Sequence, residues 1–354
     1  MRILAALAGT AVIAFTLSEF FVAFLLPRRV KHEPRIARVI LVAGWRVWRF
    51  LARRLSTRSG DTMLGFYGPL LLLFAIALWA LALIFGFALL QWAGGSHIVR
   101  GGGGGFDDDL FFSAGGFLSA SMQLSPSTAF ARALFLGEAA CGFGVLFVAI
   151  GYLPAIYQAY SRREVTVAQL APRAGTPPSA GALLVRAGRR GGWPDLDLYL
   201  AEWEGWAAEL METHLSYPAL AYFRSQHVGE NWLAALTTVL DACAFSIAAA
   251  PERSEIEAAE ITFSIGRHAL ADVSHVLRAK PRRSDPQRLS SADFDALWDL
   301  AARSGLDLGA KDEVEPRLKE LRVGYEPLVS GLSWALELAP PSWLPLAEPE
   351  TGQS

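Results

Sequence analysis

The sequence predicts an all-α integral membrane protein: three transmembrane helices with a short re-entrant helix and loop, followed by an all-helical cytoplasmic domain. Three observations support this. Long apolar stretches precede Tyr160, most charged residues follow it, and strand-like alternation is nowhere sustained. Of the 354 residues, 53% are hydrophobic and 19% are charged, and this uneven distribution does not fit a single soluble domain.

Three stretches are each long enough to supply the roughly 20 apolar residues of a transmembrane helix. Residues 3–26 and 133–160 contain one charge each, Glu19 and Glu138, and residues 70–92 contain none. The first stretch ends in Leu-Leu-Pro rather than in the small residues of a signal-peptide cleavage site. We therefore interpret residues 1–26 as a retained amino-terminal transmembrane helix.

The basic residues predict the orientation, because Lys and Arg near helix ends collect on the cytoplasmic side. The loop at 94–131 contains only Arg100, together with the acidic run Asp107–Asp109. The loop at 27–61 is strongly basic. We thus expect a multi-pass protein of the cell inner (plasma) membrane, with the amino terminus outside and the chain from Arg162 onward in the cytoplasm. The basic residues of the loop at 27–61 are Arg28, Arg29, Lys31, Arg35, Arg38, Arg46, Arg49, Arg53, Arg54 and Arg58.

Within that basic loop, apolar residues such as Ile36, Ile40 and Val47 recur at helical spacing against arginines. This pattern is typical of an amphipathic helix on the inner leaflet, with anionic lipid as the partner of residues 28–58. An ordinary cytoplasmic linker helix remains the alternative. Nucleic acid is not an expected partner of a loop that is tethered at both ends to membrane helices.

A short helix is predicted at Leu110–Leu118, and the carboxylates of Asp107–Asp109 are expected to cap its start. It has too few residues to span a bilayer. Non-helical backbone at membrane depth is tolerated only inside protein or beside water. Residues 119–125 therefore belong inside an assembly or outside the bilayer.

Several short motifs of these segments follow the pattern of one family. They are Phe66-Tyr67-Gly68-Pro69, Leu110-Phe111-Phe112-Ser113, Pro126, Ala131-Arg132, Gly151-Tyr152-Leu153-Pro154, Tyr157 to Glu164, Leu215-Ser216-Tyr217-Pro218 and Ser225-Gln226-His227. In these motifs the chain resembles the bacterial potassium-channel-like proteins of the pore-loop, two-pore-domain type. The resemblance implies a pore module at 62–163, with an outer helix at 66–93, a re-entrant pore helix and loop at 107–126 and an inner helix at 132–160. It also implies a homotetramer, since one pore loop forms a quarter of a ring, and transport of monovalent cations.

The chain departs from this family at the selectivity filter. The filter-equivalent residues are Ser119, Ala120, Ser121, Met122 and Gln123, with no glycine among them. Rings of inward carbonyls need glycine where φ is positive, so potassium selectivity is doubtful. A wider cation pathway and a closed, non-conducting pore both remain open. Two further alternatives are a non-conducting membrane scaffold or regulatory subunit, and a membrane-anchored sensor with a helical cytoplasmic domain.

Four residues of the third apolar stretch are candidate site residues. Glu138 is expected to support the pore through Arg132, Ser119 or Ser121, or else to bind an ion, because a charge at that depth needs a partner. Gly142, Gly144 and Gly151 serve either close helix packing or, as the resemblance implies, bending at a gate.

The cytoplasmic half is expected to consist of a loose linker at 164–194, a helical domain at 195–345 and a disordered tail at 346–354. Within the linker, the segment from Pro177 to Leu184 is an alternative start of a short helix. The segment at 231–249 is apolar enough for a fourth span, but Asp241 and its short length favour a buried helix. Ser290 is a plausible helix cap. The expected helices are Asp197–His214, Leu215–His227, Asn231–Ala249, Glu252–Ala279, Ser290–Ser304 and Val314–Leu338.

No catalytic motif stands out, and we expect neither an enzyme nor a cofactor. His268, Asp272 and His275 share one helix face, but without a further ligand nearby they are a weak metal signal, so no metal site is expected. Cys141 and Cys243 fall in a span and in the cytoplasmic part, so they predict no disulfide.

Overall fold

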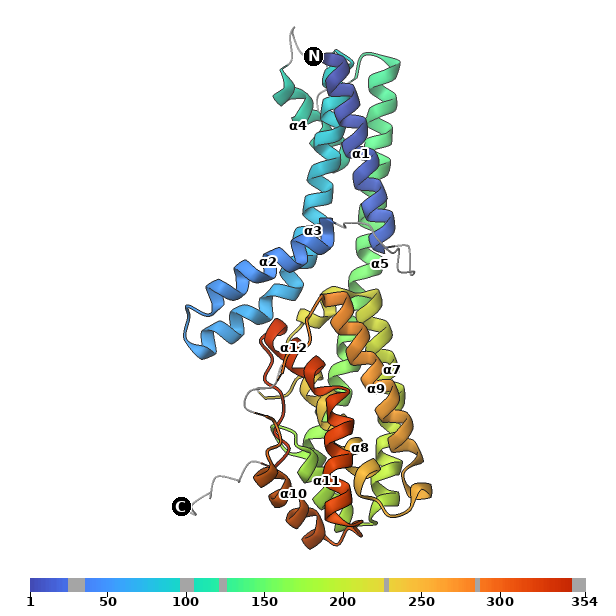
Figure 1. Ribbon diagram of the computed structural model, residues 1–354. Helices are drawn as coiled ribbons and strands as arrows, with labels where there is room; N and C mark the ends of the chain where they lie inside the picture. Colours follow the sequence, from blue (N-terminus) through green and yellow to red (C-terminus); the bar gives the residue numbers. More distant parts are fainter. Residues whose placement is uncertain (25–35, 96–104, 121–125, 226–228, 284–286, 346–354) are drawn as a thin grey trace, which may run out of the picture. The chain divides into compact units, whose positions relative to one another are not determined.

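The computed structural model describes residues 1–24, 36–95, 105–120, 126–225, 229–283 and 287–345 (Figure 1). These residues are helical apart from turns and short connections, and they contain no β-strand. The chain divides into two compact units, Met1–Tyr157 and Gln158–Ser354. The tail predicted at 346–354 lies outside the described residues.

The first unit contains helices of the kind that cross a membrane. Two of them, α1 (Arg2–Phe24) and α3 (Thr57–Ala93), pack along each other, and the third is the first part of α5 (Ala129–Ala174). Glycines permit the close approach of α1 to α3, because a Cβ atom built on Gly9 would stand 2.7 Å from the Gly86 carbonyl oxygen. Further along the same two helices the rings of Phe20 and Trp79 meet edge to face, with centroids 5.8 Å apart.

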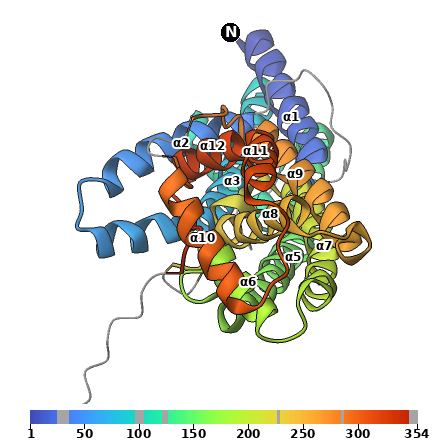
Figure 2. The same ribbon diagram turned by 60° about the horizontal axis from the view of Figure 1, so that its bottom comes forward.

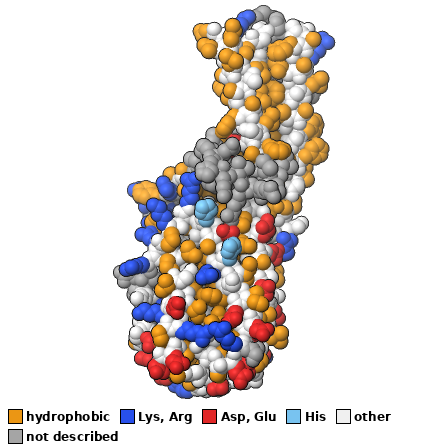
Figure 3. Space-filling model, turned by 45° about the vertical axis from the view of Figure 1, so that its right-hand side comes forward, with side chains coloured by type: hydrophobic (Ala, Val, Ile, Leu, Met, Phe, Trp, Pro, Cys, Tyr) orange, Lys and Arg blue, Asp and Glu red, His pale blue; other side chains and the backbone are white. Residues whose placement is uncertain are grey.

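Burial separates these three helices from a fourth apolar one, α8 (Trp232–Ala249). The most apolar windows of α1, α3 and α5 are only 22%, 33% and 17% buried, whereas that of α8 is 100% buried. Figure 3 shows mainly apolar side chains along the long helices of the first unit, while most of the visible acidic side chains lie on the second. The interpretation of α8 as a buried helix therefore agrees with its surroundings. The other three apolar helices indicate a membrane protein.

The amphipathic helix expected in the basic loop is α2 (Ile36–Ala52), which packs against the first part of α3. The Tyr67 hydroxyl donates to the Leu41 carbonyl oxygen at 2.5 Å, and the Trp48 indole donates to that of Met63 at 2.8 Å. To make this hairpin, α3 begins at Thr57 rather than at residue 66 as the sequence predicted.

The second unit is a bundle built around α8. Helices α7 (Trp193–Ser216) and α9 (Glu257–Leu277) pack along each other and against α8, as Figure 2 shows. The Asn231 side chain caps α8, and Ser290 and Asp293 form a reciprocal capping box at the start of α10, as predicted for Ser290. The remaining elements are α6 (Ala180–Gly188), η1 (Pro218–Tyr222), η2 (Arg253–Glu255), α10 (Ser291–Ser304), α11 (Lys311–Val323) and α12 (Glu326–Leu336).

The segment 164–194, expected to be a loose linker, is instead mostly helical. Helix α5 continues to Ala174, and α6 buries Leu183 and Leu184. The turn-forming residues are confined to 175–178 and 189–192, so they separate the helices from one another and leave each helix intact. Two other predictions differ as well. In the described part of the helix predicted at 215–227, α7 ends at Ser216 and the short 3₁₀-helix η1 follows. The helix predicted at 314–338 breaks at Gly324.

A buried charge pair holds α8 to the chain that surrounds it. The Arg288 guanidinium donates to both carboxylate oxygens of Asp241 on α8, and the two side chains are 5% and 0% exposed. The Tyr325 hydroxyl donates to the same carboxylate at 2.5 Å, and Arg288 also donates to the Pro341 carbonyl oxygen. Three segments of the second unit thus meet at one carboxylate, and Arg288 links a fourth to them.

We predict that Asp241→Ala destabilises the second unit far more than Tyr325→Phe does. The first change removes the carboxylate that binds both ends of the buried Arg288 guanidinium and leaves it only one carboxylate contact, the longer one with Glu326 at 3.5 Å, at a cost of about 3–5 kcal/mol. The second removes one hydroxyl donor, at about 1 kcal/mol. The readout is the native-state labelling rate of Cys243, which is 0% exposed, in a Cys141→Ser background. Equal labelling rates in the two variants would contradict the central role of this pair.

Candidate functional site

The candidate site of the first unit surrounds the short helix α4 (Phe106–Phe117). At 1.5 Å per residue it is about 18 Å long, well short of the roughly 30 Å core of a bilayer. One side of α4 is buried, with Phe112 and Ser113 both 0% exposed. The Phe112 ring packs on Phe135 of α5 at 5.2 Å, and Phe106 packs on Phe85 of α3 at 5.7 Å. The helix is therefore held between α3 and α5.

The start of α4 differs from the prediction. Gly105 is the N-cap residue, without a side-chain cap, and Asp107, Asp108 and Asp109 lie inside the first turn. Their carboxylates do not cap the helix but lie at the positive end of its dipole, where acidic residues are favourable. Asp109 is completely buried.

The end of α4 is a tight C-terminal turn. The Ala120 amide donates to the Gly115 carbonyl oxygen at 2.8 Å, and the Ser119 amide donates to that of Gly116 at 3.1 Å. This is the hydrogen-bond pattern of a Schellman motif, which places the residue after the cap in the left-handed region. Ser119 occupies that position with φ = 52°. Its positive φ therefore serves to end a helix.

Helix α5 touches the same last turn of α4 through Gly142. A Cβ atom built on Gly142 would stand 2.0 Å from the Phe117 carbonyl oxygen, a backbone atom that has little freedom to move. Only glycine permits this approach of α5 to α4. The packing interpretation thus accounts for Gly142.

The other two glycines lie in different surroundings. Within 4 Å of a Cβ atom built on Gly144 or on Gly151, the structure describes no neighbour. They share an exposed face of α5 with large apolar side chains, including Phe147 at 70% and Ile150 at 61% exposure. This face is open to lipid or to other copies of the chain.

Glu138 of α5 is buried against α4. It is 0% exposed, and a Cβ atom built on Gly116 would stand 3.2 Å from its Oε2 atom, with the Ser113 hydroxyl nearby. Neither carboxylate oxygen makes a hydrogen bond to a residue that the structure describes. A buried carboxylate without a partner is costly, so Glu138 is a candidate functional group.

The partner expected for Glu138 is corrected in part. Arg132 donates instead to the Pro126 carbonyl oxygen at 3.2 Å, and Ser113 of α4, rather than Ser119, is the neighbouring serine. The sequence analysis missed Ser113. A signal was present, because Asp109 and Ser113 are polar residues four apart on an otherwise apolar helix face.

The filter-equivalent segment is described only at its start. Ser119 and Ala120 are exposed at the end of α4, after Leu118, which is 71% exposed. Ser121, Met122 and Gln123 lie outside the described residues, so their predicted role stays a prediction.

In the second unit, Arg163 contacts the chain between two motifs singled out in the sequence, Leu215–Pro218 and Ser225–His227. Its guanidinium, in the motif that ends at Glu164, donates to the Leu220 and Phe223 carbonyl oxygens at 3.0 and 2.8 Å. The Tyr160 hydroxyl donates to the Arg224 carbonyl oxygen at 3.0 Å. The Leu220 carbonyl oxygen also accepts from the Phe223 amide at 3.1 Å, so Arg163 binds the end of the short 3₁₀-helix η1.

His214 lies beside Arg163 and is 1% exposed. Because a carbonyl oxygen only accepts, the Nδ1–H group of His214 donates to the Leu210 carbonyl oxygen at 2.7 Å. The imidazole is therefore neutral, and its Nε2 atom accepts from Nη1 of Arg163 at 3.4 Å. Burial, together with the Arg163 charge, lowers the pKa of His214 to about 3.

Comparisons with protein-family models, with curated proteins and with solved structures found no match for this chain.

We predict that Gly142→Ala destabilises the first unit or separates α4 from α5, whereas the matched change Gly144→Ala has little effect. The first variant places a methyl group against the Phe117 carbonyl, and the second places one in open space. Overpacking of this kind costs about 1–3 kcal/mol. Thermal unfolding of the detergent-purified protein, followed by tryptophan fluorescence, measures the difference, and equal melting temperatures would argue against the contact.

We predict that stability of the second unit falls as the pH is lowered from 7 to 5. A histidine with a lowered folded pKa takes up its proton more readily when unfolded, so stability is full above about pH 6.5 and is lost towards the folded pKa of about 3. The slope approaches about 1.4 kcal/mol per pH unit.

His214→Phe should remove this component, whereas His268→Asn, at a side chain that is 66% exposed, serves as the control. Chemical unfolding of the full chain at several pH values gives the slopes. A slope that His214→Phe leaves unchanged would assign the pH dependence to another group.

Proposed function

We propose that this chain is the subunit of an oligomeric, channel-like membrane protein of the plasma membrane that transports monovalent cations without selecting potassium. The observation that carries the proposal is the short helix α4, held between α3 and α5 and ended by a tight turn at 118–120. A helix too short to cross a bilayer, followed by non-helical backbone, is the frame of a pore loop.

Assembly with other copies is supported by what a single chain leaves uncovered. Leu118, Ser119 and Ala120 are exposed at the end of α4. The face of α5 that carries Gly144, Phe147 and Gly151 is exposed as well. Polar backbone at membrane depth needs protein or water around it, and further copies around an axis would provide both. Four copies are proposed from the resemblance to pore-loop channels.

Poor selectivity is supported by the conformation of Ser119. Its positive φ caps α4, and the residues that follow contain no glycine that would turn successive carbonyl groups inward. A second candidate function, a non-conducting scaffold or regulatory subunit, is favoured by this same observation if the loop seals the pore.

The test is the current of the purified full-length chain in planar bilayers under potassium, sodium and chloride gradients. We expect a conductance with a reversal potential that discriminates poorly between potassium and sodium. A reversal potential that follows the potassium gradient would contradict the selectivity argument, and absence of any current would favour the non-conducting subunit.

Matched cysteine variants locate the pathway. On a Cys141→Ser background, a charged thiol reagent should block current through Ser119→Cys, whose side chain is exposed, and spare Ser113→Cys, which is buried in α4. Block at position 113 alone would place the pathway on the other side of α4.

A further inference from the structure

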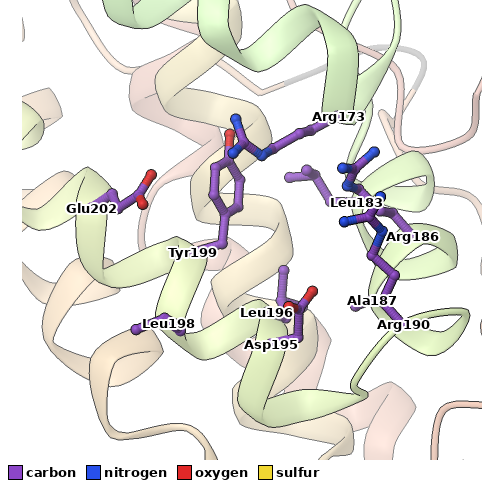
Figure 4. Close-up of a pocket in the computed structure, with 10 residues that line it drawn as sticks. All are labelled: Arg173, Leu183, Arg186, Ala187, Arg190, Asp195, Leu196, Leu198, Tyr199 and Glu202. Carbon is purple, nitrogen blue, oxygen red and sulfur yellow. The ribbon is translucent and has the colours of Figure 1, made fainter.

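A cavity of about 180 Å³ lies in the second unit, between the end of α5, α6 and the start of α7. Three arginines line it: Arg173 in the last turn of α5, Arg186 in α6 and Arg190 just after α6. In Figure 4, Arg186 and Arg190 stand on one side of the cavity and Tyr199 of α7 on the other, with Arg173 reaching over the Tyr199 ring.

These three arginines have no ion-pair partner among the residues that the structure describes. The Arg173 guanidinium lies 4.7 Å from the Tyr199 ring centroid and donates only a long bond, 3.4 Å, to the Gln169 carbonyl oxygen. Asp195 and Glu202 also line the cavity, but neither forms an ion pair with these arginines. Their donors are therefore left for a ligand.

The Tyr199 hydroxyl is a further uncommitted donor. It is buried and makes no hydrogen bond to a described residue. Burial raises the pKa of Tyr199, which keeps the hydroxyl protonated. A second hollow of about 220 Å³ shares Arg173, Tyr199 and Glu202 with the first, and the Trp206 indole N–H that lines it is likewise buried without a partner.

We propose that this cavity binds the phosphoryl group of a small anionic ligand. A guanidinium group can donate two parallel hydrogen bonds to the oxygens of a phosphoryl group. Three guanidinium groups and a neutral hydroxyl donor therefore fit a phosphoryl dianion better than they fit a carboxylate, which carries a single charge. The first cavity is smaller than the pockets of about 300–1,000 Å³ that hold drug-sized ligands, so it accommodates a phosphate or pyrophosphate group. Any remainder of the ligand extends across Arg173 towards Trp206.

The site goes beyond the proposed transport function, because it needs no residue of the first unit. The carboxylates of Asp195 and Glu202, which also line the cavity, disfavour an anion larger than a phosphate or pyrophosphate group. A phosphoryl group could come from a soluble metabolite or from a lipid headgroup, and the experiment separates the two sources.

The test is calorimetric titration of inorganic phosphate and pyrophosphate into the full-length chain in phosphatidylcholine nanodiscs. Arg173→Gln and Arg186→Gln should each weaken pyrophosphate binding at least tenfold, because each loses charge-assisted bonds. The matched control is Arg189→Gln, an exposed neighbour that does not line the cavity and should bind like the parent protein.

Tyr199→Phe removes only the hydroxyl and tests the site without the risk of misfolding. It should weaken pyrophosphate binding several-fold while leaving the thermal unfolding temperature close to that of the parent chain. Competition by phosphatidylglycerol nanodiscs that Arg186→Gln abolishes would support the same phosphoryl site with a lipid source. Absence of binding, or an equal loss in Arg189→Gln and Arg186→Gln, would overturn the proposal.

Discussion

The approach of α5 to the last turn of α4 at Gly142 is the contact on which the first unit depends. Helix α4 is too short to cross a bilayer by itself, so its backbone must be covered by protein. The absence of a side chain at position 142 lets the α5 backbone lie against the Phe117 carbonyl. This close approach brings Phe135 onto Phe112, and it also places Glu138 against Gly116. The candidate site follows from this packing.

The arginines of the second unit lie in two kinds of environment. Arg288 and Arg163 are almost fully buried, and each is satisfied by a carboxylate together with backbone carbonyl oxygens. Burying a guanidinium is tolerable only with such complete pairing. Arg173 and Arg186 are half-buried beside a cavity and have no ion pair with a described residue. The contrast makes the cavity arginines stand out as groups that packing alone does not explain.

The sequence predicted helices wherever a local signal marked them. Ser290 and Asp293 cap α10 as expected, and Asn231 caps α8, because caps depend on a few adjacent residues. The segment 215–227 could not be predicted in this way. The carbonyl groups of Leu220 and Phe223 accept from Arg163, more than fifty residues earlier in the chain, and helical periodicity contains no information about such a distant donor.

The site residues show the same limit. Burial of Glu138 at a costly depth was readable from one charge in an apolar stretch, but its neighbour Ser113 belongs to another helix and required the packing angle set by Gly142. The absence of glycine from residues 119–123 was also readable, and the structure adds a physical consequence. Ser119 adopts the one positive φ that the described part of this segment contains, and it uses that conformation to end α4. Because this conformation of Ser119 ends a helix, it does not turn a carbonyl group towards an ion. For this reason we do not propose potassium selectivity for this chain.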